Sequence, residues 1–406
     1  MPISTLSTLP FVCSKPLMVN FFRPVHSILG LPVDILSLST AQERIYTATN
    51  TRTPCFLSTP NLNFAAACLK DREFRNSVIN SDLSIADGMP LVWIARLLGV
   101  PIKERVTGSG LFERLQQKPD KVISVYFFGG INGAAEKAEE RINAHPSGLR
   151  CVGSHSPGFG SIEELSQEKL IENINKSRCD FLIIALGAKK GQAWIERNKS
   201  RLQVSVISHL GAVVNFAAGS IQRAPHWVQQ TGLEWLWRIK EEPLLWRRYF
   251  DDGLAFLNLL ATRVIPGAIS RRRHLPTSDA LLNARVVITG DENLRCIKPQ
   301  GAWCESNLSH LRRSFEKVAR LRVNVVVDLS KTSFVDSAFI GILMLLYGHQ
   351  HRFGLVFNIT QATPLIRRMF KYHCADFLLQ ADSTEKSEPL PQGESLPLQI
   401  SDSVKI

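Results

Sequence analysis

The chain has 406 residues, a formal net charge of +12 at pH 7 and a sequence pI near 9.4. This length exceeds the usual size of a single hydrophobic core, so two domains are expected. The positive charge favours anionic partners, such as nucleotides, phospholipid headgroups or nucleic acid, without choosing among them. The eight cysteines form no Cys-x-x-Cys pair and no histidine stands at zinc spacing, which predicts reduced cytosolic thiols and no structural metal.

Neither a signal peptide nor a membrane-spanning helix is predicted. Residues 1–22 lack a basic start and a long apolar run, and prolines interrupt them. The longest apolar runs, Leu254–Ala261 and Phe339–Tyr347, are well short of the ~20 residues that span a bilayer. Any membrane contact is therefore predicted to be peripheral.

Alternating strands and helices make up the first predicted unit. Residues 1–30 are expected to be a poorly ordered lead-in, and an amphipathic helix is expected from Val33 to Tyr46. Beyond it, the pattern predicts strands at 55–59, 83–86, 122–128, 181–186 and 204–208, and helices at 63–70, 89–98 and 134–143. Apolar strands separated by helices of this length predict an α/β fold, with a largely parallel sheet covered by helices on both faces.

A change of composition at residues 265–282, which are rich in proline, glycine, arginine and small polar residues, predicts a linker between two domains. Strands expected at 285–289 and 323–329, with helices at 306–320 and 337–349, predict a second, smaller α/β unit over 283–380. Residues 381–406 are rich in Ser, Glu, Pro and Gln and have little to bury, so a disordered tail is expected there.

Polar side chains follow two predicted strands at the point where each strand ends. Asp87 follows the strand at 83–86 and precedes a helix, which places a carboxylate at the rim where doubly wound sheets bind ligands. There it could act as a general base for a weakly nucleophilic hydroxyl, although capping of the helix explains an isolated Asp equally well. Thr59 and Asn61 end the previous strand in the same manner, and their expected proximity to Asp87 favours a site.

Glycine turns at three strand exits are candidate diphosphate sites. They contain Gly129 and Gly130, Gly187, and Gly211. Backbone N–H groups at a helix start can hold phosphate without a metal, although each turn alone is a weak signal. The Gly-x-Gly-x-x-Gly spacing and a ribose-binding acidic residue are missing, which counts against a nicotinamide-dependent oxidoreductase. The first unit has no Asp-x-Asp, so a nucleotide sugar would be held by helix dipoles and cations.

Residues 207–237 join a glycine turn, a small-residue helix, an Arg-Ala-Pro step and an aromatic, basic amphipathic stretch. Arg223 and Arg238 lie among several tryptophans, an arrangement that suits phosphate binding or a membrane interface. By composition alone, a surface helix that packs a tryptophan stripe inward is the commoner arrangement.

Taken together, these residues closely resemble the WecG/TagA/CpsF family, bacterial glycosyltransferase family 26. The resemblance covers roughly residues 33–250 and rests on ordered segments that include STPNLNFAAACLKD, LSIADGMPLVW, GVPIKERVTGSGLF, YFFGG, DFLIIALGAKKGQAWI and GAVVNFAAGSIQRAPHWVQQ. It implies a Rossmann-like fold and an inverting, metal-independent transfer that needs no cofactor. The donor would be a UDP-sugar, and the acceptor a glycan linked to polyprenyl diphosphate.

The resemblance also assigns roles to residues. Asp87 takes the position of the family's base, and Thr59, Asn61 and Arg223 match substrate-site residues. The stretch 225–264 corresponds to the C-terminal appendage that the family uses at the membrane and over the active site. Its residues expected to face the membrane or the acceptor are Trp235, Arg238, Arg247 and Arg248. The resemblance therefore implies a cytoplasmic protein on the inner face of the cytoplasmic membrane, acting in exopolysaccharide or cell-envelope glycan synthesis without a nucleic acid partner.

Two departures from the family pattern concern the donor site. Many members have Gly-x-Pro-Lys-Gln-Glu where this chain has residues 187–192, Gly-Ala-Lys-Lys-Gly-Gln, and many have an aspartate where this chain has Asn215. The donor sugar is therefore open, and so is an alternative in which the chain is an inactive membrane-associated scaffold.

The second unit resembles the STAS fold of anti-sigma-factor antagonists and sulfate-transporter tails. DLSKTSFVDSAFIG, residues 328–341, aligns with that family's Asp-Ser loop, and Ser337 matches its phosphorylatable serine. The resemblance implies regulation or a protein partner at this unit. An Asp-Ser helix cap is the structural alternative.

Overall fold

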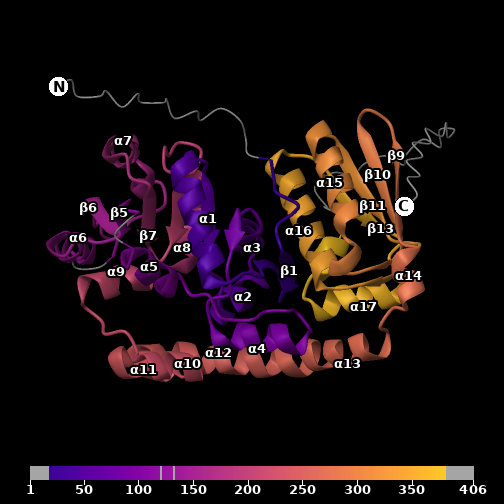
Figure 1. The fold of residues 1–406 in the computed structure, drawn as a ribbon, viewed down its shortest axis with the longest axis horizontal. Helices are drawn as coiled ribbons and strands as arrows, with labels where there is room; N and C mark the ends of the chain where they lie inside the picture. The colour runs from indigo at the N-terminus through magenta and orange to yellow at the C-terminus, as the bar shows by residue number, and fades with distance from the viewer. Residues whose placement is uncertain (1–17, 119–120, 131–132, 381–406) are drawn as a thin grey trace.

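The computed structural model describes residues 18–118, 121–130 and 133–380. Most of the predicted lead-in and the whole predicted tail, residues 381–406, lie outside the described residues. Two α/β units stand side by side, and one long helical segment runs beneath both of them (Figure 1).

The first unit is built on a six-stranded sheet in which every pair of neighbouring strands is parallel. Its strands, in the spatial order β4-β3-β8-β7-β5-β6, are Leu83–Ser84, Cys55–Ser58, Val206–His209, Phe181–Ala185, Ile123–Gly129 and Leu149–His155. Its helices are α1 Leu38–Thr51, α2 Leu62–Cys68, α3 Arg72–Ile79, α4 Met89–Leu97, α5 Gly108–Gln116, α6 Ala134–Ala144, α7 Glu168–Ser177, α8 Ala188–Asn198 and α9 Gly211–Ala218. The predicted α/β class, with a parallel sheet flanked by helices, is confirmed.

The central strand β7 shows why the sheet is parallel and covered. Residues 181–184 are apolar and fully buried, because each face of the strand packs against a separate hydrophobic layer. The spatial order places β3 and β4 on one side of β8 and β5 and β6 on the other side of β7. The carboxyl ends of all these strands share one edge, which is where such sheets bind ligands.

The N-terminal part of this unit differs from the sequence expectation. Residues 25–28, expected within the lead-in, form strand β1, which pairs antiparallel with β2, Leu31–Asp34. Leu29 and Gly30 make the turn with positive φ angles of 51° and 78°. Val33 therefore lies in a strand, and the first helix begins only at Leu38, where the Ser37 side chain caps it.

The second unit contains a five-stranded sheet. Its strands are β9 Arg285–Gly290, β10 Leu294–Trp303, β11 Asn324–Asp328, β12 Thr332–Val335 and β13 Phe357–Thr360. They lie in the order β12-β10-β11-β13 with parallel pairing, and β9 adds to β10 antiparallel. Its helices are α14 Ser278–Leu282, α15 Ser309–Leu321, α16 Ser337–Arg352 and α17 Pro364–Tyr372.

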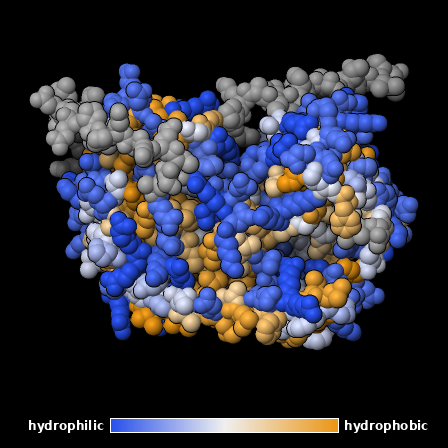
Figure 2. Space-filling view, turned by 180° about the vertical axis from the view of Figure 1, so that it is seen from behind, coloured by the Kyte–Doolittle hydropathy of each residue, from blue (hydrophilic) through white to orange (hydrophobic). Residues whose placement is uncertain are grey.

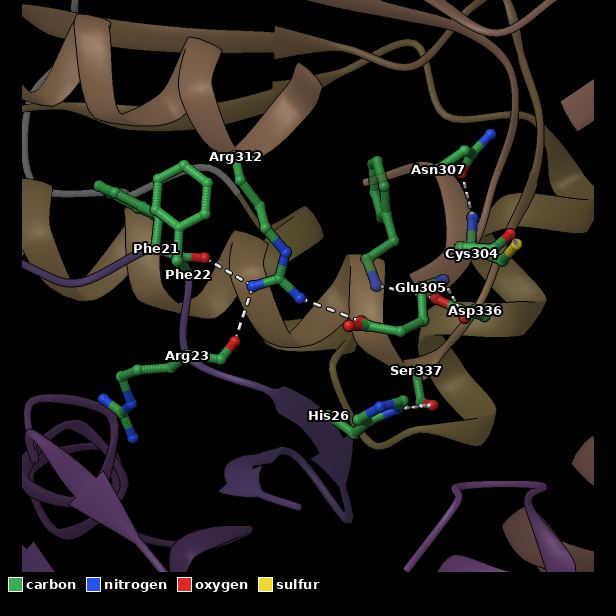
Figure 3. Close-up of polar contacts among 12 residues, drawn as sticks. Phe21, Phe22, Arg23, His26, Cys304, Glu305, Asn307, Arg312, Asp336 and Ser337 are labelled. Carbon is green, nitrogen blue, oxygen red and sulfur yellow. Dashed lines mark hydrogen bonds and ion pairs between the residues drawn. The ribbon is translucent and has the colours of Figure 1, made fainter. Parts of the chain in front are cut away.

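The two units share an interface built around β1 and α16. Gly341 lets the helix approach the hairpin closely, because a Cβ at this position would lie 2.8 Å from the carbonyl oxygen of Val25. The Arg312 guanidinium donates to the carbonyl oxygens of Phe21 and Arg23 at 2.6 and 2.7 Å (Figure 3). Buried contacts of this kind join the units through the N-terminal segment as well as through the chain connection.

The predicted linker is helical. Residues 225–273 contain α10 His226–Thr231, α11 Glu234–Glu241, α12 Trp246–Leu259, a π-helical turn Leu260–Val264 and α13 Ile265–Arg273. Pro243–Arg273 form one helical segment of 31 residues that is long and apolar enough to cross a membrane by length and composition. The sequence did not indicate this segment, because the expectation counted only uninterrupted apolar runs.

One face of this long helical segment packs against the rest of the protein. Val264 is fully buried, and a Cβ at Gly267 would lie 2.9 Å from the Cβ of Tyr372 in α17. The opposite face carries exposed apolar side chains, which we call the apolar belt: Leu244, Trp246, Phe250, Leu254, Leu257, Ile265 and Ile269. Figure 2 shows apolar side chains gathered along the lower edge of the molecule, where Figure 1 places this helix.

Candidate active site

A cavity of about 620 Å³ lies at the carboxyl edge of the first sheet. One wall consists of strand ends and the starts of the following helices, and the other consists of α11 and α12. The predicted site residues that line it are Thr59, Asn61, Asp87, Gly130, Gly187, Gly211, Trp235, Arg238 and Arg248. The structure thus brings together residues from five strand ends and from the C-terminal appendage.

Asp87 stands at the end of the chain segment that continues β4. Its backbone N–H donates to the carbonyl oxygen of Pro60 at 2.8 Å, which fixes it beside the end of β3. Its carboxylate Oδ2 accepts a hydrogen bond of 3.2 Å from the backbone N–H of Gly108, the first residue of α5. Desolvation raises the pKa of Asp87 to about 6, and the hydrogen bond from Gly108 opposes this shift. A carboxylate with such a pKa is ionised near neutral pH and can accept a proton.

Thr59 and Asn61 flank this carboxylate on the neighbouring strand exit. Asn61 is the N-cap of α2, and its Oδ1 accepts from the backbone N–H of Phe64 at 3.0 Å. The capping alternative considered from the sequence is therefore present, while the same side chain also lines the cavity. An amide NH₂ group in the lining of the cavity is suited to a sugar hydroxyl.

The glycine turns have two different functions in the structure. Gly187 precedes α8 and Gly211 begins α9, so two helix N-termini open into the cavity, an arrangement that suits an anion. Gly130 also lines the cavity, whereas Gly129 does not. Gly129 has a φ of 102°, and a Cβ there would lie 2.6 Å from the carbonyl oxygen of Ala185, so it is required for close packing of β5 on β7.

The helical wall is attached by ion pairs and hydrogen bonds. Arg105 pairs with Glu234 of α11 at 3.0 Å, with both side chains largely buried. Asn63 donates to Asp252 of α12 at 2.9 Å. These contacts hold α11 and α12 against the strand ends.

Arg238 is the cation of this wall that is best placed for a ligand. It pairs with Glu242 at 2.8 Å and lies over the ring of Phe216, with 5.7 Å to the ring centroid. Its Nε is buried and has no hydrogen-bond partner among the described residues. Arg248 is more exposed and pairs loosely with Asp252 at 3.8 Å.

Besides Gly129, three predicted site residues lie outside the cavity. Arg223 pairs with Glu113 of α5 and lines an adjacent cavity that shares Met89 and Arg105 with the first. Arg247 is exposed on α12. Ser337 lies at the interface of the two units, where its Oγ is 2.9 Å from Nδ1 of His26 (Figure 3).

Several residues of the cavity were missed by sequence reasoning: Arg105, His209, Glu234 and Tyr249. Arg105 belongs to a segment that carried the family resemblance, but nothing in the sequence indicated its partner. Glu234 belongs to the appendage, where only aromatic and basic residues were considered, and Tyr249 was not among the aromatic residues selected there. Across the described ranges, no group of three or more His, Cys, Asp or Glu side chains is arranged to hold a metal ion.

Comparison with known proteins places this site in a family context. Residues 26–268 match the profile of the Glycosyl transferase WecG/TagA/CpsF family. An N-acetylglucosaminyldiphosphoundecaprenol N-acetyl-beta-D-mannosaminyltransferase from Bacillus spizizenii is 24% identical over 227 residues, which are 56% of this chain and 86% of that protein. The protein of the same name from Bacillus subtilis is 24% identical over 193 residues, 47% of this chain and 73% of its own. That from Staphylococcus aureus is 22% identical over 214 residues, 52% and 82% respectively.

Proposed function

The chain belongs to the WecG/TagA/CpsF family of glycosyltransferases, and from this premise we propose that it moves a sugar from a UDP-sugar to a glycan linked to polyprenyl diphosphate. The observation that carries this proposal is the carboxylate of Asp87, which is desolvated at the wall of a cavity of about 620 Å³. The named relatives act on an acceptor linked to undecaprenyl diphosphate, which supports the acceptor class.

The proposed reaction is a single displacement. Asp87 takes the proton of the acceptor hydroxyl as this oxygen attacks the anomeric carbon, the bond from that carbon to the diphosphate breaks, and UDP leaves. Attack from the face opposite the leaving group inverts the anomeric configuration. The helix starts at Gly187 and Gly211 offer N–H groups to the departing diphosphate, so the proposed transfer requires no metal ion.

The acceptor is proposed to enter along the helical wall. Arg238 and Arg248 supply positive charge for its diphosphate, and Trp235 and Phe256 supply apolar surface next to them. From this wall the apolar belt continues along the long helical segment. A lipid-linked substrate would thus remain in the membrane while its sugar reaches Asp87.

We further propose that the protein binds the inner face of the cytoplasmic membrane peripherally, with the long helical segment lying in the interface. Exposed apolar side chains recur on one face of this helix. Arg247, Arg272 and Arg273 are exposed on the same segment, whereas Arg271 packs against Gly99. An amphipathic helix with arginines beside its apolar face suits anionic headgroups. The packing of its opposite face on both units favours this arrangement over a transmembrane one.

The second unit is proposed to be a STAS-like regulatory or partner-binding module, with Ser337 as a possible phosphorylation site. Ser337 is only 5% exposed and contacts His26 of the first unit. A phosphate on this oxygen would need the two units to separate locally, because the added bulk and charge cannot share the buried contact. Unchanged activity in Ser337→Asp and Ser337→Ala, together with no binding partner for this unit, would remove the proposal.

A release assay for UDP tests the transferase. The full-length protein, on vesicles and in the presence of EDTA, is given UDP-sugars and a polyprenyl-diphosphate-linked N-acetylglucosamine acceptor. UDP release that needs both substrates, with an inverted product anomer, supports the proposal. The substituted loop at 187–192 keeps an inactive scaffold as the alternative, and absence of release with every donor and acceptor tested would favour that alternative.

A further inference from the structure

His209 is a half-buried histidine of the cavity with no assigned role. It is the last residue of β8, and its side chain lines the cavity between α8 and α9. Its Nε2 is shielded from solvent and has no hydrogen-bond partner among the described residues. Buried polar atoms normally have a partner, and His209 lines a substrate cavity, so a bound ligand is a candidate partner for this nitrogen.

Two glycines make the slot in which this imidazole lies. A Cβ at Gly191 of α8 would lie 2.3 Å from Cδ2 and 3.0 Å from Cγ of the His209 ring. On the other side, a Cβ at Gly211 would lie 3.5 Å from Nε2. Gly191 does not have a positive φ. Its backbone conformation therefore does not require glycine, and the missing side chain makes room for the imidazole ring. Any larger residue at position 191 would displace the imidazole.

The character of the slot indicates what kind of group the imidazole contacts. Burial lowers the pKa of His209 to about 4, so the ring is neutral at physiological pH. The N-termini of α8 and α9, which flank the ring, already offer N–H groups to an anion. A neutral imidazole adds no charge to that site, but it can donate or accept one hydrogen bond.

We propose that His209, held in place by the space at Gly191, hydrogen-bonds a neutral substituent of the donor sugar, such as a hydroxyl or acetamido group, and thereby helps to select the donor. This inference rests on the proposed function, because it assumes a UDP-sugar with its diphosphate at the two helix starts. The sugar is bonded directly to that diphosphate and must lie within reach of Asp87, which lines the same cavity.

Calorimetric binding of UDP and of a panel of UDP-sugars to the full-length protein tests the proposal. The panel contains UDP-glucose, UDP-N-acetylglucosamine, UDP-N-acetylmannosamine and UDP-glucuronic acid. His209→Ala is expected to weaken binding of the preferred UDP-sugar about tenfold, the size of one buried hydrogen bond, and to leave UDP binding unchanged. His209→Gln keeps a neutral hydrogen-bonding group and is expected to retain part of the affinity.

The role of Gly191 is tested by a double-mutant cycle. Gly191→Ala is expected to reproduce the effect of His209→Ala because it displaces the ring, and the double variant is expected to be no weaker than His209→Ala alone. Lys317→Ala on α15 is the control for a helix substitution, since this exposed residue lies outside the cavity. Thermal unfolding of each variant shows whether it is folded.

The outcomes separate this inference from the proposed function. Equal weakening of UDP and UDP-sugar binding in folded His209→Ala would place the contact on the nucleotide and overturn the inference while leaving the transferase intact. Unchanged UDP-sugar affinity would overturn it as well. If the wild-type protein bound neither UDP nor any UDP-sugar, the donor class itself would be wrong, and the inference would fall with it.

Discussion

The two walls of the cavity differ in how their residues are held. One consists of strand ends and is called the sheet wall here, and the other consists of α11 and α12 and is called the helical wall. Thr59, Asp87 and Gly211 sit at the ends of paired, buried strands, and their positions follow from the sheet. Trp235 and Arg248 belong to helices that are half exposed, and the contacts of Arg105 with Glu234 and of Asn63 with Asp252 tie these helices to the sheet. In the proposed mechanism, the chemistry lies on the sheet wall, and the helical wall serves the acceptor and the membrane. Changes on the first should lower kcat, and changes on the second should weaken acceptor or membrane binding.

The largest effect is expected from Asp87→Asn on the sheet wall. Loss of the proton acceptor should lower kcat about 10²–10⁴-fold, as is typical for a general base, with donor binding retained. Rates of UDP release measure this effect, and Asp279→Asn, on the exposed helix α14, is the matched control. Equal activity of the two variants would contradict the assignment of Asp87.

The thermal stability of Asp87→Asn shows whether lost activity could come from unfolding. The raised pKa of Asp87 means that the folded state favours the protonated form, so stability is lost as pH rises from the unfolded-state pKa through about 6. An uncharged asparagine avoids that loss. Asp87→Asn is therefore expected to have an equal or higher Tm at pH 7, so lost activity would not come from unfolding.

On the helical wall, the next effect is expected in the apolar belt. Leu254→Glu combined with Leu257→Glu should weaken binding to anionic vesicles about 100-fold, because two partly exposed leucines lose their burial in lipid. Turnover of a soluble, short-chain acceptor should change little. Leu321→Glu, an equally exposed leucine on α15, is the control in a vesicle co-sedimentation assay. Equal binding of both proteins would place the membrane contact elsewhere.

A smaller effect is expected at the ion pair that attaches the helical wall. Arg105→Ala and Glu234→Ala should each raise the KM for the acceptor about three- to tenfold while kcat changes less, because the pair is largely shielded from solvent. A double-mutant cycle should show coupling, in contrast to the exposed Arg320–Glu316 pair of α15. If kcat fell and the KM for the acceptor did not change, the pair would act with the sheet wall instead.

The sheet wall was largely predictable from the sequence, and the helical wall was not. Thr59 and Asp87 stand where apolar strands end, and strand pairing brings such ends together irrespective of their spacing in the chain. Arg105 and Glu234 come from segments that pack together in the structure. The spacing of apolar residues in the sequence does not show this contact. His209 is one histidine at a strand end, and its importance depends on the space left by Gly191, which is visible only in three dimensions.

The helical form of the predicted linker was not predictable for a related reason. Pro266, Gly267 and three arginines indicate a break when they are considered locally. In the structure, Pro266 occupies the first turn of α13 after a π-helical turn, where its missing N–H costs little. Gly267 faces Tyr372 at a distance that no side chain would permit. The sequence pattern therefore indicated the connection between the units, but not that it is helical and packs closely on α17.

The pH dependence of kcat/KM for the wild-type protein tests most directly whether the desolvated Asp87 is the base. The account predicts an activity that falls on the acid side with an apparent pKa near 6, because protonation removes the proton acceptor. Buffers from pH 4.5 to 8 with a soluble acceptor would define this limb. An activity that stays constant down to about pH 4.5 would contradict the account, since it would mean that no carboxylate with a raised pKa takes part.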